Sequence, residues 1–125
     1  MKTLSLEHII QIHVLVLQQT GGGEGLRDLG RLEAVIATQT QEVFGEELYK
    51  TVFEKAGAMC RGIVADHPFV DGNKRTAMLV STTYLAVNGH EFIAKKGELE
   101  DFAVRIAVEH LDIAVIATWL KAHIK

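Results

Sequence analysis

Nine consecutive residues, His67–Arg75, bring together side chains that can accept a proton, hold a metal ion and bind an anion; they read HPFVDGNKR. The imidazole of His67 is the kind of group that can act as a general base and take a proton from an attacking hydroxyl group. Asp71 offers the hard oxygen ligand that Mg²⁺ prefers, and one carboxylate is enough where water and nucleotide phosphates complete the coordination shell. These residue types at this spacing predict phosphoryl-transfer chemistry.

The second half of the segment fits the start of a helix. The first N–H groups of a helix lack partners and carry partial positive charge, so they favour an anion. We predict that Asp71 is the N-cap, unless binding of magnesium shares or replaces that role. Gly72, Asn73 and Lys74 then follow as the first helical residues: Gly72 lets a ligand approach the backbone, and Asn73 supplies an amide donor. Lys74 and Arg75 add two cations, of which the arginine can hold a phosphate through paired hydrogen bonds.

Helices on both sides must position this segment. An apolar stripe over residues 48–64 predicts a helix that stops just before Pro68, because a proline disfavours the α conformation in the residue that precedes it. The stretch Thr76–Asn88 contains no charged residue, which is typical of a helix buried on all sides. Between the two helices we expect Phe69 to point into the core and fix the loop.

Helical periodicity and capping residues predict further helices. Ser5 fits the N-cap of the first, and Asp28 that of the second. Four glycines within residues 21–25 end the first helix; they lack the preceding strand and the following Lys-Ser/Thr of a phosphate-binding loop, so we interpret them as a surface loop. Two later helices and one loop or small hairpin complete the pattern: Glu98–Glu109, Asp112–Ile124 and Thr38–Glu47. About six helices joined by short links indicate an all-α bundle, in one domain over residues 1–125.

The composition excludes several classes of protein. Thirteen Lys and Arg against 16 Asp and Glu give a net charge of −3, without the basic surface of a general nucleic-acid-binding protein. No run of about 20 apolar residues is present, and the first residues do not form a secretory signal, so we expect a cytoplasmic protein without a membrane anchor. The single cysteine, Cys60, lies in an apolar stretch and is interpreted as a core residue. Five other histidines form no metal-binding pattern and are expected to be ordinary core or surface residues: His8, His13, His90, His110 and His123.

The segment HPFVDGNKR resembles the active-site motif of the Fic/Doc family, roughly His-x-Phe-x-Asp/Asn-Gly/Ala-Asn-Gly/Lys-Arg. Every defined position of that motif is matched. The segment GLRDLGRLEAVIA after the first helix, the chain length and the uncharged stretch after the motif extend the resemblance more loosely over the whole chain.

The resemblance implies an α-helical fold with the motif in a loop between two helices, and transfer of part of a nucleotide to a Ser, Thr or Tyr hydroxyl of a protein. Three roles follow by position: His67 as the base, Asp71 as the magnesium ligand and Phe69 as a structural residue. The other motif positions would bind the nucleotide, with an anion hole and two phosphate contacts formed by Gly72, Asn73, Lys74 and Arg75. ATP and Mg²⁺ are the implied substrate and cofactor.

Two departures from the family pattern favour its Doc branch. Fic proteins that attach AMP usually have a glycine where this chain has Lys74, and a second arginine where it has Met78. The Doc branch carries the lysine together with a reversed nucleotide and kinase activity. It implies a toxin that phosphorylates elongation factor Tu, inhibits translation, and is silenced by an antitoxin whose disordered segment folds into a surface groove. AMP transfer remains the alternative enzymatic interpretation, and a non-catalytic helical binding module the alternative outside catalysis. The resemblance also suggests that Thr38–Glu47 is a flap that binds the target.

Overall fold

The computed structural model describes residues 1–125, which form six α-helices and one short β-hairpin. The elements are α1 (Leu6–Thr20), α2 (Leu29–Ala37), β1 (Glu42–Val43), β2 (Glu46–Glu47), α3 (Val52–Asp66), α4 (Asn73–Val87), α5 (Glu98–Glu109) and α6 (Ile113–Ala122). The predicted all-α class and the small hairpin are confirmed. No helix has the combination of length and apolar character that a membrane span requires.

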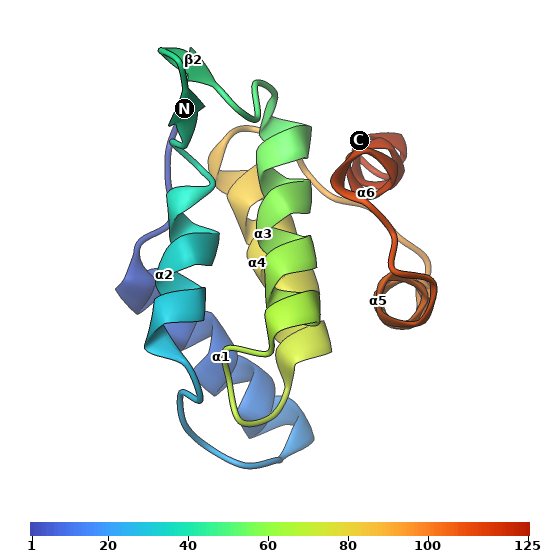
Figure 1. Ribbon diagram of the computed structural model, residues 1–125. Coiled ribbons are helices and arrows are strands. Elements are labelled where there is room, and N and C mark those ends of the chain that lie inside the picture. The colour runs from blue at the N-terminus through green and yellow to red at the C-terminus, as the bar shows by residue number, and fades with distance from the viewer.

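Helices α3 and α4 pack against each other at the centre, with α1 and α2 on one side and α5 and α6 on the other (Figure 1). They share a core of 22 buried residues. Two glycines of α3 permit close packing: a Cβ atom added to Gly57 would lie 3.1 Å from the carbonyl oxygen of Ile113 on α6, and one added to Gly62 would lie 2.8 Å from Val35 on α2. Glycine at these positions therefore lets α2 and α6 approach the backbone of α3 on two sides.

The predicted caps of α1 and α2 are confirmed, because the side chains of Ser5 and Asp28 each accept a hydrogen bond from the backbone N–H three residues on. Asp112 caps α6 in the same way. The start of α3 was predicted too early. Thr51 caps that helix and Leu48 lies exposed before it.

The predicted cap of α4 is wrong. Gly72, not Asp71, is its N-cap, and it adopts a left-handed conformation with φ of 74° and makes no side-chain cap bond. The Asp71 carboxylate is bonded instead to the backbone N–H groups of Gly72 and Gly23. Between Thr76 and Leu85 every residue of α4 is buried or partly buried, whereas Ala86 and Val87 in the last turn are exposed. The central helix is therefore largely buried between its first and last turns.

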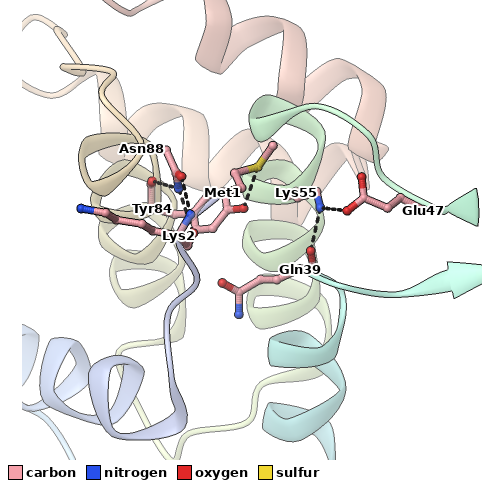
Figure 2. Close-up of polar contacts among 7 residues, drawn as sticks. All are labelled: Met1, Lys2, Gln39, Glu47, Lys55, Tyr84 and Asn88. Atoms are coloured by element: carbon pink, nitrogen blue, oxygen red, sulfur yellow. Dashed lines mark hydrogen bonds and ion pairs between the residues drawn. The ribbon is translucent and has the colours of Figure 1, made fainter.

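The hairpin is anchored to the core by a buried lysine of α3. Lys55 is 3% exposed, and its ammonium group donates to the carbonyl oxygen of Gln39 at 2.8 Å and to the carboxylate of Glu47 at 2.7 Å (Figure 2). At the tip, Phe44 and Gly45 both have positive φ angles, as a two-residue hairpin turn of type I′ requires, and the Phe44 side chain is fully exposed. The base of the hairpin is thus fixed while its tip projects into solvent.

Residues at the C-terminal end of α4 hold the N-terminus of the chain. The backbone N–H and carbonyl of Lys2 bond both ends of the Asn88 side-chain amide, and the hydroxyl of Tyr84 donates to the sulfur of Met1 (Figure 2). Elsewhere in the core, burial raises the pKa of Cys60 to about 12, so its thiol stays protonated. This agrees with its interpretation as a packing residue.

Candidate active site

The loop between α3 and α4 turns sharply at both of its ends. His67 ends α3 in the left-handed conformation, with φ of 49°, and Pro68 follows it. Gly72 supplies the second left-handed residue just before α4. Because the carbonyl oxygen of Pro68 accepts hydrogen bonds from the N–H groups of Arg27 and Asp28, the segment that leads into α2 also holds the loop.

Phe69 and Asn73 close the loop on itself. The backbone N–H of Phe69 donates to Oδ1 of Asn73 at 3.0 Å, and Nδ2 of Asn73 donates back to the carbonyl oxygen of Phe69 at 2.9 Å. The Phe69 ring is 1% exposed and points into the core, as predicted. The Asn73 side-chain amide is buried and bonded to the loop backbone, so it is not the free phosphate donor that the sequence predicted. The backbone N–H of Asn73, at the start of α4, has no partner within the helix and is the donor that could face an anion.

Two backbone donors hold the carboxylate of Asp71. Gly23, in the loop after α1, donates to Oδ2 at 3.2 Å, and Gly72 donates to Oδ1 at 2.8 Å. These two bonds lower the pKa of Asp71 below its ordinary value, the Gly23 bond having the larger effect. Asp71 is therefore an ionised, oriented carboxylate at neutral pH.

A cavity of about 560 Å³ opens at the N-terminus of α4. Its wall contains six of the seven predicted site residues: His67, Asp71, Gly72, Asn73, Lys74 and Arg75. The seventh, Phe69, lies beneath them in the core. Residues of α1, α4 and α5 line much of the remaining wall, among them Gln19, Met78 and Glu100. The structure thus gathers the predicted base, carboxylate and cations around one space.

The cavity is electrostatically suited to an anion on one side. The intrahelical hydrogen bonds of α4 begin with the N–H of Thr76, which donates to the carbonyl of Gly72, so the preceding N–H groups of the helix have no partner within it. Lys74 and Arg75 are exposed on the same first turn. Arg75 pairs with Glu100 at 3.5 Å, a half-exposed contact that costs little to replace by a phosphate.

The site offers a divalent cation one suitably held carboxylate, that of Asp71. No group of three or more His, Cys, Asp or Glu side chains is placed to hold a metal ion. Mg²⁺ is commonly held by one or two carboxylates together with water and substrate phosphates, and Asp71 supplies one ionised carboxylate beside an anion site. The residues present therefore fit a magnesium ion that arrives with a nucleotide.

Sequence reasoning missed the residues that hold the motif from outside. His13 on α1 bonds the carbonyl of Asp71, Gly23 bonds its carboxylate, and Arg27 donates to the carbonyl oxygens of Asp66 and His67 at 2.6 Å each. Each acts across at least 39 positions of the sequence, so no local spacing could have revealed it.

Comparison with known proteins agrees with this geometry. A sequence model of the Fic/DOC family matches residues 3–85, about two thirds of the chain, and this range contains the whole motif. The chain belongs to the Fic/DOC family. The resemblance noted from the motif alone is thereby confirmed.

Two relatives from the Fic/DOC family match most of the chain. "Toxin Doc" of Mycolicibacterium smegmatis is 34% identical over 102 residues, which cover 80% of this chain and 78% of the relative. "Protein kinase doc" of Escherichia phage P1 is 31% identical over 121 residues, which cover 97% of this chain and 94% of the relative.

Proposed function

We propose that this protein is a Doc-type toxin and a protein kinase, which transfers the γ-phosphate of ATP to a serine or threonine hydroxyl of a target protein. The observation that carries the proposal is the cavity at the start of α4, where His67, Asp71 and two cations face one space. The names of the two relatives, a toxin and a protein kinase, support it.

In this proposal the first turn of α4 binds the phosphates. Its backbone N–H groups, Lys74 and Arg75 hold the phosphate oxygens and stabilise the charge that develops on them. Asp71 would hold Mg²⁺, which neutralises phosphate charge when it is bound. Positioning and charge stabilisation together account for most of the catalysis of phosphoryl transfer.

His67 then acts as the general base. Its imidazole takes the proton of the target hydroxyl as the hydroxyl oxygen forms a bond to the γ-phosphorus, and the bond from phosphorus to the bridging oxygen breaks to release ADP. His67 suits this role because its side chain is exposed at the cavity edge, while the loop backbone beneath it is fixed by Arg27.

Phosphate transfer is favoured over AMP transfer by two residues of the cavity wall. Lys74 places a long cation where AMP-transferring Fic proteins usually have glycine, and Met78 stands where they have a second arginine. A non-catalytic binding module is less well supported, because binding an anion requires neither the imidazole of His67 nor the carboxylate of Asp71.

A toxin of this type requires a partner that silences it and a target. We propose an antitoxin with a disordered segment that folds as a helix into a surface groove. A groove of about 550 Å³ between α1 and the glycine loop is a candidate, since exposed Ile10, Val14 and Leu26 line it. For the target we propose a translation factor such as elongation factor Tu, whose modification would inhibit translation.

The test uses ATP labelled at the γ or the α position, with purified elongation factor Tu and with a bacterial lysate. Label transferred only from γ-labelled ATP, with a mass gain of about 80 Da on the acceptor, supports the kinase. Label from α-labelled ATP and a gain of about 329 Da would establish AMP transfer instead. Absence of label from both would favour the binding module.

A further inference from the structure

A histidine outside the motif contacts its centre. His13 lies on α1, 58 residues before Asp71, and α1 passes beside the loop between α3 and α4 (Figure 1). Its side chain is 3% exposed and makes one hydrogen bond and one ring stack, both with the motif. Nε2 lies 2.8 Å from the carbonyl oxygen of Asp71, and the imidazole ring stacks on Phe69 with 3.9 Å between ring centroids.

The chemistry of the hydrogen bond fixes the direction of the proton. A carbonyl oxygen only accepts, so Nε2 of His13 carries the hydrogen and donates it. The stack on Phe69 is nearly parallel, at 8°, and prevents the imidazole from rotating away from its acceptor. His13 is therefore a fixed donor aimed at one peptide group of the motif.

That peptide group connects His13 to the Asp71 carboxylate. The carbonyl of Asp71 and the N–H of Gly72 belong to one planar unit, so they turn together and point in opposite directions. The N–H of this unit donates to Oδ1 of Asp71 at 2.8 Å, while its oxygen accepts from His13. If the plane rotates, both bonds weaken, and the carboxylate loses one of its two backbone donors.

We propose that His13 is a positioning residue for the active site: by holding the Asp71–Gly72 peptide it orients the Asp71 carboxylate and the first N–H groups of α4 for magnesium and nucleotide. This inference rests on the proposed function. Residues that orient a metal ligand from outside typically contribute 10- to 100-fold to affinity or activity.

Three substitutions separate the hydrogen bond from packing. The Nε2 atom of glutamine lies as many bonds from the backbone as Nε2 of histidine, so His13→Gln can keep the bond. His13→Asn is one carbon shorter and cannot reach. His13→Phe keeps a flat ring against Phe69 but leaves the Asp71 carbonyl without its donor. Leu120→Ala is the control for lost stability, because Leu120 is fully buried on α6 and lies outside the cavity wall.

The measurement is calorimetric binding of ATP with and without Mg²⁺ in the absence of any acceptor protein, at a temperature where circular dichroism shows every variant folded. We expect His13→Phe and His13→Asn to lose about tenfold or more of the Mg²⁺-dependent affinity, and His13→Gln to stay within about threefold of wild type. Leu120→Ala should lower the melting temperature and leave affinity unchanged.

The inference is overturned if His13→Phe binds Mg·ATP as wild type does, or if His13→Gln loses as much as His13→Asn. If His13→Phe or His13→Asn fails to fold, comparison of the remaining one with His13→Gln still tests the inference. The two proposals fail separately: a wild type that binds Mg·ATP but transfers no label refutes the kinase while the binding comparison still judges His13. A wild type that does not bind Mg·ATP refutes both.

Discussion

Substitution of Gly22 tests how closely the glycine loop controls Asp71. A Cβ atom at Gly22 would lie 2.8 Å from Oδ2 of Asp71 and 3.3 Å from Cδ2 of Leu17. Favourable non-bonded contacts begin at about 3.5 Å, so in Gly22→Ala the carboxylate or the loop must move by about 0.7 Å. The carboxylate end of the exposed Asp71 side chain yields more readily than the partly buried Leu17, so we expect Asp71 to move.

The expected consequence is a loss of transfer larger than the loss of stability. A misplacement of about 1 Å in an active site can cost roughly 100-fold in rate, so a displacement of this size predicts a 10- to 100-fold slower γ-phosphate transfer. Gly22 has a φ of +121°, so the alanine also carries backbone strain of about 1–2 kcal/mol.

Gly25→Ala is the matched control. Its φ of +111° imposes similar strain, but its added Cβ meets only Val70, at an ordinary 3.9 Å. Both variants should lose similar stability in urea unfolding, and only Gly22→Ala should lose most of the transfer measured with γ-labelled ATP. Equal transfer rates for the two variants would refute the claim that the loop acts on Asp71.

Three further predictions concern stability. Asn73→Ala removes both side-chain bonds to the buried Phe69 backbone and should lower the free energy of unfolding by about 2–4 kcal/mol; a loss below 1 kcal/mol would show that the clamp is unimportant. Lys55→Met leaves the Gln39 carbonyl unpaired and should cost about 1–3 kcal/mol while hydrogen exchange quickens in the hairpin; unchanged exchange would contradict the anchor. Hydrogen bonds from the Lys95 N–H, the larger effect, and from His123 lower the pKa of Glu98 in the folded protein. Ionised Glu98 therefore stabilises the fold above the pKa that it has in the unfolded chain, and this stabilisation is lost as the pH falls through its pKa in the folded protein. The melting temperatures of wild type and Glu98→Gln should therefore converge between about pH 5 and pH 3, and a constant gap would argue against this bond.

Local signals predicted the helices and the motif well. Ser5 and Asp28 are capping residues whose effect reaches only three positions, and each caps the predicted helix. Pro68 likewise ends α3 through its own geometry and that of its neighbour. The motif is also local, so its base, carboxylate and cations could be assigned a common site from nine adjacent residues.

The contacts of the site that the sequence did not reveal depend on residues distant along the chain. Asp71 has the residue type and position of an N-cap. Its carboxylate instead accepts a hydrogen bond from the N–H of Gly23, which lies in the loop after α1. The role of His13 depends on α1 passing beside the motif, 58 positions away along the chain. A single sequence specifies these contacts only through the complete fold.

Removal of the His67 imidazole tests the central claim most directly. Mg·ATP binding and γ-phosphate transfer are measured on the same preparations of wild type and His67→Ala. The account predicts binding within about twofold of wild type, because the phosphate contacts lie on α4, and a loss of transfer of about 10²- to 10⁴-fold, because the general base is gone. Transfer at the wild-type rate, or a loss of binding that fully accounts for the loss of transfer, would contradict it.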